Sequence, residues 1–441
     1  IFRHLAFKLP GAPPPRFMME LLPHDEKKGW LRRRAQSPDL RLYKSILRET
    51  FSERRWRLFA VNPLSNPRKW EAFLQTLEEQ LLVLEKPGLD AEACMSLSDR
   101  CRALTEQYVG IHICSLLWAN VLYQACEGLL VARGQGSLVR DLLRPVEESW
   151  TVKTNHALWR LGRGEMDRES FLSEYGHRAA SSWELFCSRW REASVQVDVL
   201  SEAAAQHTDP ALLANQQAQR ARASLERVSG PIRILVEMTQ HYLLLRENQR
   251  FHFDRLLWAW KVQLLALEEH AGLELRFLPI NEVEDFLSGT LSRSDATDRV
   301  LRRKKEWVRE IDRRNQGDEP PNFLIGTEGA AAHLDAQRLQ GTGTSPGVVT
   351  GMVRILRTPE DGARLQKGDI LVTRATDPGW TPLFLKAGGL VVELGGMLSH
   401  GAVVAREYGL PAVANVPGAT TQLKDGQWVT IDGRQGVVWV Q

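Results

Sequence analysis

The spacing of apolar residues changes once along the chain, near residue 341, and this change limits the folds that are possible. Between residues 67 and 312, apolar side chains recur three and four residues apart, as in Trp70, Phe73 and Leu77, which is the spacing of an amphipathic helix. After residue 347, short valine-rich runs alternate with glycine-containing turns, which is typical of strands. The sequence therefore predicts a mainly helical domain followed by a small C-terminal β/α domain.

The predicted elements and boundaries follow from this division. Helices are expected over 108–133, 137–162, 168–192, 210–245, 247–271 and 282–315, and strands over 348–356, 370–373, 390–394, 412–413, 428–431 and 437–440. Proline and basic residues predict an N-terminal arm or linker over 1–66, ahead of the helical domain at 67–314. A Pro/Gly-bearing tract predicts a linker or docking segment over 315–340, and 341–441 forms the C-terminal domain.

Composition excludes several classes of protein. The 441 residues are 43% hydrophobic, which is enough for about two or three domains with proper cores. Lysine and arginine number 57 and aspartate and glutamate 54, so a net charge of +3 gives no argument for nucleic acid or a membrane surface as a partner. Five cysteines without Cys-x-x-Cys spacing indicate reduced thiols, and no metal site is predicted. Without a secretory signal or a bilayer-length apolar run, we expect a cytoplasmic location.

One histidine lies where a predicted strand changes into a predicted helix. Gly395 and Gly396 follow the strand and allow a tight turn, and Ser399 can cap a helix that begins at His400. The free N–H groups and the positive dipole end of that helix would stabilise an anion attached to the imidazole. Since a neutral imidazole is a nucleophile near pH 7, the pattern suits a phosphohistidine, although an isolated Ser-His pair is more often structural.

Three motifs in the C-terminal domain carry a family resemblance. They are Gly341-Thr342-Gly343-Thr344-Ser345-Pro346-Gly347, Thr376-Asp377-Pro378-Gly379-Trp380-Thr381-Pro382 and Glu393-Leu394-Gly395-Gly396-Met397-Leu398-Ser399-His400-Gly401. In this order they resemble the swivelling phosphohistidine domain of the dikinase-like phosphotransferases, which include phosphoenolpyruvate synthase and the rifampicin phosphotransferases. Ser399 departs mildly from the rifampicin type, which commonly has threonine there.

The resemblance implies a role for each of these motif residues. His400 would carry a phosphoryl group between two distant sites, which makes it the catalytic residue. Six others would support the loop or contact the phosphate: Gly395, Gly396, Ser399, Gly401, Thr376 and Thr381.

Two polar clusters resemble motifs in the helical, substrate-binding domain of the rifampicin phosphotransferase-like proteins. The first contains His177 and Arg178, and the second contains Arg246 and Glu247, followed by Arg250. Such side chains can bind a phosphate or orient an acceptor hydroxyl. They can equally form a buried ion-pair network that fixes the packing of the helices, and the sequence leaves both interpretations open.

The resemblance also implies partners. The rifampicin type has an ATP-grasp domain ahead of the helical and phosphohistidine domains, and residues 1–66 contain no glycine-rich phosphate-binding loop. We therefore expect a phosphotransferase component with no cofactor of its own, charged from ATP and Mg²⁺ on an ATP-grasp protein or domain, and a small-molecule acceptor. The alternative is a non-catalytic regulatory or scaffold protein in which His400 is vestigial.

A carrier histidine must travel between its two sites, so the sequence should contain a hinge. Gly341, Gly343 and the small polar residues around them predict this hinge at 341–345, within the segment 337–347.

We expect residues 1–441 alone not to bind ATP tightly, because the sequence contains no nucleotide-binding loop. Titration calorimetry with ATP and Mg²⁺ measures this directly. Binding at micromolar ATP would contradict the prediction.

Overall fold

The structure is a computed structural model of the chain, and it describes residues 65–179, 185–206, 208–315, 324–325, 328–329, 338–396 and 399–441. The predicted arm over 1–66 lies outside these residues except for its last two, and the predicted linker over 315–340 lies largely outside them. The described chain contains a helical domain and a C-terminal mixed sheet, which confirms the predicted fold class.

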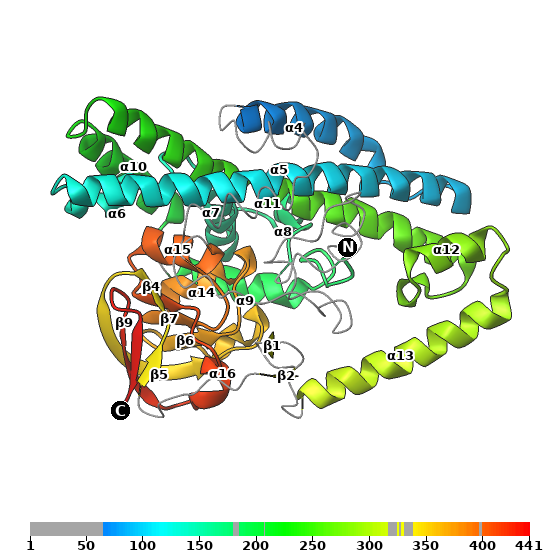
Figure 1. Cartoon of the computed structure of the whole chain (residues 1–441). Helices are drawn as coiled ribbons and strands as arrows, with labels where there is room; N and C mark the ends of the chain where they lie inside the picture. Colours follow the sequence, from blue (N-terminus) through cyan, green and yellow to red (C-terminus); the bar gives the residue numbers. More distant parts are fainter. Residues whose placement is uncertain are drawn as a thin grey trace.

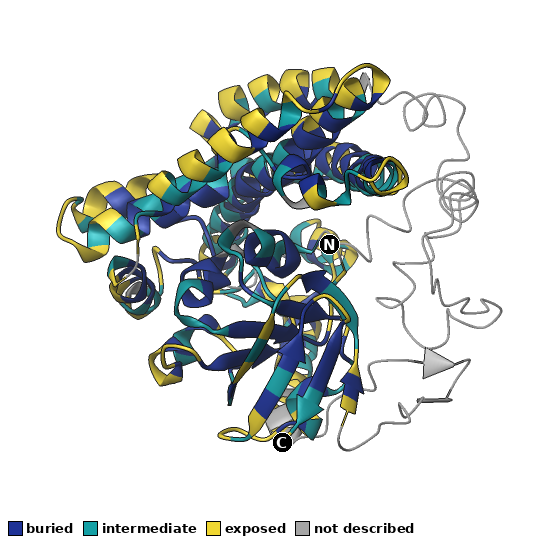
Figure 2. Ribbon diagram, turned by 90° about the vertical axis from the view of Figure 1, so that its left-hand side faces the viewer, coloured by how far each residue is buried: buried dark blue, intermediate teal, exposed yellow. Residues whose placement is uncertain are grey.

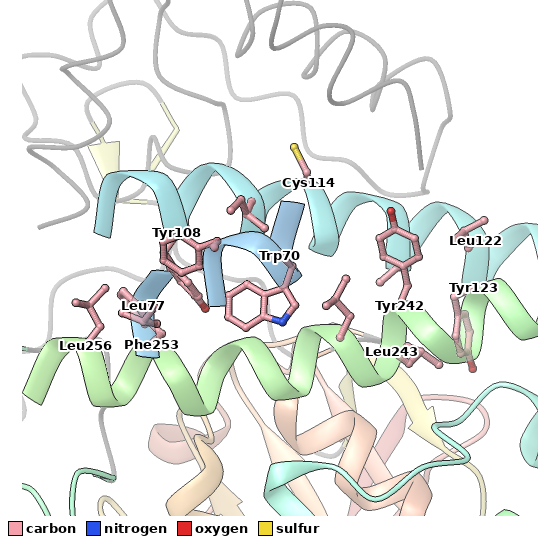
Figure 3. Close-up of a cluster of buried hydrophobic side chains, with 14 of the residues drawn as sticks. Trp70, Leu77, Tyr108, Cys114, Leu122, Tyr123, Tyr242, Leu243, Phe253 and Leu256 are labelled. Atoms are coloured by element: carbon pink, nitrogen blue, oxygen red, sulfur yellow. The ribbon is translucent and has the colours of Figure 1, made fainter. Parts of the chain in front are cut away.

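Two long helices form the centre of the helical domain. Helices α5 (Ala91–Ala132) and α11 (Pro231–Ala271) pack along each other beneath α4 (Ser65–Leu84) (Figure 1). In their shared core, the rings of Tyr108 and Phe253 stack with centroids 4.2 Å apart, and Trp70 meets Tyr108 edge-on (Figure 3). The other helices are η3 (Gly136–Leu138), α6 (Val139–Leu142), α7 (Trp150–Gly162), α8 (Arg168–Tyr175), α9 (Ser194–Ala205), α10 (Pro210–Leu225), η4 (Leu275–Phe277), α12 (Ile280–Leu287) and α13 (Arg293–Asn315).

Several predicted helix boundaries are wrong. Helix α5 begins at Ala91 and not at residue 108, and the helices expected over 137–162 and 282–315 are each divided in two. The helix expected over 168–192 ends at Tyr175, and Gly176 follows it where a Cβ would lie 2.2 Å from the carbonyl oxygen of Leu172. The helix expected over 210–245 is broken before Pro231, where Gly230 adopts a φ of 64°. The break expected between 245 and 247 does not exist, because α11 continues through these residues.

Helix α5 is long and apolar enough, by length and composition, to cross a membrane. Its buried side chains include Tyr108, Ile111 and Leu122, which pack in the core shared with α4 and α11. Central helices of large helical domains have the same composition, because they are apolar on most sides.

The C-terminal sheet has eight strands in the order β3-β10-β9-β5-β6-β7-β8-β4, and the four strands β5, β6, β7 and β8 are parallel. Alternate residues face opposite sides, so Leu371 and Leu390 face the helical domain while Val372 and Val391 pack toward α16 (Ala419–Gln422). The strands are β3 (Arg338–Gln340), β4 (Thr342–Ser345), β5 (Val348–Ile355), β6 (Ile370–Thr373), β7 (Gly389–Val392), β8 (Ala412–Ala414), β9 (Trp428–Asp432) and β10 (Val437–Val440), and β1 (Leu324–Ile325) pairs separately with β2 (Glu328–Gly329).

The predicted hinge over 341–345 is wrong, because these residues belong to the sheet. Strand β3 pairs with β10 and β4 pairs with β8, so the sheet includes residues from Arg338 onward. The glycines are needed for close contact: a Cβ on Gly343 would lie 2.6 Å from the carbonyl oxygens of Gly433 and Arg434. Any hinge therefore precedes Arg338.

An apolar interface joins the two domains. Helix α9 packs against α14 (Thr381–Lys386) and against η5 (Pro359–Arg364), with Val197 and Leu200 in one core cluster with Leu383 and Phe384. Phe251 of α11 belongs to the same cluster. In Figure 2 the central strands and the inward faces of the helices are largely buried, whereas the outer strands are partly exposed and the outer faces of the helices are exposed. The two domains therefore share a continuous core in this arrangement.

We expect Gly343→Ala to lower the free energy of unfolding by more than about 2 kcal/mol, because the new methyl group would overlap backbone oxygens in the sheet. Gly128→Ala is the matched control. Gly128 is exposed and lies within α5, away from its ends, and a Cβ there meets nothing within 4 Å. It should stabilise the chain by about 0.5–1 kcal/mol. Thermal unfolding of both variants tests this, and equal effects would refute the packing argument.

Candidate functional site

The histidine loop connects β7 to α15 (His400–Tyr408), and His400 is the first residue of the helix. Ser399 has the extended backbone of a helix cap, but its hydroxyl makes no capping hydrogen bond. The predicted capping by this side chain is therefore wrong. The hydroxyl points toward Gly395 instead, where a Cβ would lie 2.9 Å from Oγ, and among the described residues this buried oxygen has no hydrogen-bond partner.

The glycines of the loop make room for side chains. Gly395, Gly396 and Gly401 all have ordinary negative or extended φ angles, so none is required for a left-handed turn. A Cβ on Gly401 would lie 2.5 Å from Oγ1 of Thr376, and Gly395 leaves space for Ser399. Nothing in the structure explains why residue 396 is a glycine, because a Cβ there meets nothing within 4 Å.

Within its own domain, His400 contacts the start of α14. Oγ1 of Thr381 lies 3.1 Å from Nε2 of His400, and the Phe384 ring lies 6.1 Å from the imidazole. Nδ1 is buried and has no hydrogen-bond partner in the described structure. Thr381 and Thr376 thus both lie beside the histidine loop.

The helical domain lies against the other side of His400. Burial lowers the pKa of His400 to about 4; the negative charge of Glu247 opposes this shift, and the positive charges of Arg178, Arg246 and Arg250 add to it. His400 is therefore neutral at pH 7 in this arrangement. A neutral imidazole has the free lone pair that a nucleophile needs.

Glu247 is a buried carboxylate held by two neighbours. Nη2 of Arg246 donates to its Oε1 at 2.5 Å, and Oγ1 of Thr151 donates to its Oε2 at 3.3 Å. Burial raises the pKa of Glu247, but the charges of Arg246 and His400 and these two hydrogen bonds outweigh burial and leave the pKa lowered. Glu247 is therefore ionised at neutral pH.

A second buried carboxylate, Asp254, organises two arginines. It lies 3.7 Å from Nε of Arg178 and 3.3 Å from Nε of Arg250. Arg178 is only 1% exposed, and its Nε and Nη2 have no hydrogen-bond partner among the described residues. Arg250 also reaches Asp377 of the C-terminal domain at 3.4 Å, so this ion pair crosses the domain interface.

The structure thus brings Arg178, Arg246 and Glu247 to His400, whereas His177 packs elsewhere. The imidazole of His177 meets the Phe251 ring edge-on at 4.6 Å, and burial lowers its pKa well below the ordinary value. We did not anticipate Thr151 or Asp254 from the sequence. The signal for Asp254 was its spacing of four and seven residues from Arg250 and Glu247, which places all three on one helix face.

A cavity of about 400 Å³ lies elsewhere along the interface. Its walls come from the segment before α7, from α10 and from Tyr408 at the far end of α15. Tyr408 is eight residues from His400, which is about 12 Å along a helix, so this cavity is not next to the histidine. Among the described residues, no group of three or more His, Cys, Asp or Glu side chains is arranged to hold a metal ion.

Comparison with known proteins identifies the C-terminal domain. The family described as "PEP-utilising enzyme, mobile domain" matches residues 365–436. A rifampicin phosphotransferase of Bacillus cereus is 53% identical over 108 residues, which cover 24% of this chain and 12% of the relative. A phosphoenolpyruvate synthase of Aeropyrum pernix is 48% identical over 102 residues, covering 23% of this chain and 12% of the relative.

One similarity extends into the helical domain. A rifampicin phosphotransferase of Streptomyces sviceus is 30% identical over 302 residues, covering 61% of this chain and 34% of the relative. The chain thus spans about a third or less of the length of these relatives. These matches show that the C-terminal domain is similar to the mobile domain of PEP-utilising enzymes, and that a longer part of the chain is similar to a rifampicin phosphotransferase.

Proposed function

We propose that this chain is the transfer component of a phosphohistidine phosphotransferase. His400 accepts a phosphoryl group at an ATP site on an ATP-grasp protein or domain and passes it to a small molecule bound by the helical domain. The observation that supports this proposal is the position of half-buried His400 at the head of α15, where the charges of Glu247, Arg246 and Arg250 of α11 act on it. This is the arrangement that delivery to an acceptor in the helical domain would need.

The loop around His400 suits a phosphoryl group on Nε2. Oγ1 of Thr381 already lies 3.1 Å from that nitrogen and could donate to a phosphoryl oxygen. The hydroxyl of Ser399 is buried without a partner among the described residues, so a phosphoryl oxygen would satisfy it. Gly395 and Gly401 would support the loop by leaving room for Ser399 and Thr376.

The arginines would stabilise the charge of the transferring group. Arg178, Arg246 and Arg250 act electrostatically on His400 from the helical domain. Arg178 has donors without hydrogen-bond partners in the described part of the chain, and Asp254 restrains both it and Arg250. Phosphoryl transfer depends mainly on positioning and charge stabilisation, so guanidinium groups that are already in place would stabilise the charge of the transferring group. His177 would have a structural role, because its imidazole packs against the Phe251 ring.

The proposal requires the C-terminal domain to travel. The residues of the predicted hinge lie in the sheet, so the moving connection would precede Arg338. ATP and Mg²⁺ would be held by the ATP-grasp partner or domain and not by this chain. Rifampicin is one candidate acceptor, because relatives that match parts of this chain are named for it.

We expect His400→Ala to abolish phosphoryl transfer, because no other described imidazole occupies the loop. The chain is incubated with ATP, Mg²⁺ and the ATP-grasp part of a rifampicin phosphotransferase, and acid-labile phosphate is located by peptide mass spectrometry. The wild-type chain should be labelled at His400, and the variant should keep its helical circular dichroism without that label.

His241→Ala is the control, since His241 is exposed on α11. Transfer that persists in His400→Ala would refute the mechanism. A wild-type chain that takes no label would support the scaffold alternative instead.

We expect acid to weaken domain docking. The pKa of His400 is about 4 when docked and 6.5 in its ordinary state, so its contribution to docking is complete above pH 6.5 and is lost as the pH falls toward 4. The charged groups facing it are Glu247, which opposes this shift, and Arg178, Arg246 and Arg250, which reinforce it. Small-angle scattering between pH 7.5 and 5 measures the opening, and His400→Asn should flatten the dependence. Identical pH profiles for the two chains would contradict this.

A further inference from the structure

The cavity at the domain interface is enclosed by three parts of the chain. One face of α10 contributes the small side chains of Ala211, Ala214 and Ala218. The segment between α6 and α7 forms a second wall, and Tyr408, the last residue of α15, forms a third. The volume of about 400 Å³ falls within the range of small-molecule sites, about 300–1,000 Å³. Because a water molecule occupies about 30 Å³, the cavity can hold a ligand of about a dozen non-hydrogen atoms.

The cavity follows from the way α10 is packed. At the N-terminal end of this helix, Oδ1 of Asp209 lies 2.7 Å from Nδ1 of His156 on α7. At the other end, Nε2 of Gln135 donates to the carbonyl oxygen of Arg227 at 3.2 Å, and the helix packs against α6. Between these contacts, the three alanines are spaced three and four residues apart on one helix face and leave space beside residues 144–149.

The two ends of the cavity differ in charge. Arg144 follows α6, and Arg222 lies in the half of α10 that packs against α6, so two guanidinium groups line the same end. Arg144 is 7% exposed. At the opposite end, the exposed Glu148 precedes Ser149, which caps α7. The cavity therefore has a cationic end, an acidic end and, between them, an apolar wall that includes Val146.

We propose that this cavity binds a small monoanion with an apolar body, such as an aromatic carboxylic acid, whose carboxylate meets Arg144 and Arg222. A guanidinium group has five N–H donors and can hold a carboxylate through two parallel hydrogen bonds. The apolar body lies between the alanine face of α10 and Val146, where it removes apolar surface from water. A neutral molecule of the same shape gains these apolar contacts but not the charge-assisted hydrogen bonds.

Tyr408 makes this site depend on docking of the C-terminal domain. Its hydroxyl accepts a hydrogen bond from Nδ2 of Asn155 on α7 at 3.1 Å. When the C-terminal domain leaves, the cavity loses the wall that Tyr408 supplies, so the ligand binds the docked arrangement more tightly and favours it. Such a ligand would hold His400 at the helical domain and away from the ATP site. This last consequence rests on the proposed function, whereas binding itself does not.

The test uses two probes of about the size of the cavity, 4-(trifluoromethyl)benzoate and its uncharged analogue 4-(trifluoromethyl)benzamide. Fluorine NMR of each probe measures its dissociation constant for the 441-residue chain. The benzoate should bind with a dissociation constant of about 1 mM or less, which is ordinary for a ligand of a dozen atoms. The benzamide should bind about tenfold more weakly. Equal affinities would overturn the assigned ligand class, and an unbound benzoate would mean that the cavity holds solvent only.

A matched pair of variants on α10 locates the binding. Ala214→Phe places a ring in the cavity and should abolish binding of both probes. Ala223→Phe is the control, because Ala223 is exposed on the same helix and does not line the cavity. Benzoate binding that survives Ala214→Phe, or that is lost equally in both variants, would overturn the site.

Two further variants test the cationic end. Arg144→Met should weaken benzoate binding about tenfold and leave benzamide binding unchanged, which would also show that the cavity is intact. Arg222→Gln repeats the test at an exposed position, where the substitution disturbs no buried side chain, and it should also weaken the benzoate alone. Arg220→Met, at another exposed position of α10, is the control. Unchanged benzoate binding in Arg222→Gln and Arg144→Met would overturn the role of the guanidinium groups.

A last comparison separates this inference from the proposed function. Tyr408→Ala should weaken both probes about tenfold, because it removes the wall that the C-terminal domain supplies, and unchanged affinities would overturn the link to docking. His400→Ala should bind both probes as the wild-type chain does. Normal probe binding by a wild-type chain that transfers no phosphoryl group would overturn the proposed function and leave the binding site standing.

Discussion

The position of His400 at the boundary between two domains is the constraint on which the rest of the site depends. The histidine begins α15 in the C-terminal domain, but its protonation state is set mainly by desolvation and then by charged residues of α8–α9 and α11. Away from this interface, its pKa would return toward the ordinary value near 6.5. Docking therefore favours the neutral form of the imidazole.

The docked arrangement combines apolar packing with a few polar contacts. Val197, Leu200 and Phe251 share a core cluster with Leu383 and Phe384, and Nδ2 of Asn155 donates to the Tyr408 hydroxyl at 3.1 Å. Such packing holds α15 along the helical domain, so that its first residue meets α11. The polar contacts across the interface, including that of Arg250 with Asp377, fix the position of one domain on the other, because a buried charge without its partner would be costly.

The sequence predicted local features well and long-range ones poorly. All six predicted strands are present within one or two residues, since alternating apolar residues and turn glycines are local signals. Strands β3 and β4 were missed, because their glycines suggested a hinge and only the pairing with β10 and β8 makes them strands. In the helical domain, the continuity of α11 through residues 245–247 was missed, and Asp254 was not recognised although it lies in the predicted helix 247–271.

By itself, the sequence determined the order of the two domains and the strand-to-helix loop, and it predicted His400 as the reactive residue of that loop, because these follow from spacing and residue type over a short stretch. It also identified Arg178, Arg246 and Glu247 as polar candidates, but it left a structural ion-pair network equally open. Only the tertiary structure decided that these side chains face His400 and that Thr151 and Asp254 restrain them. The physical reason is that residues 150–250 positions apart meet only when two separately folded domains bury a common surface.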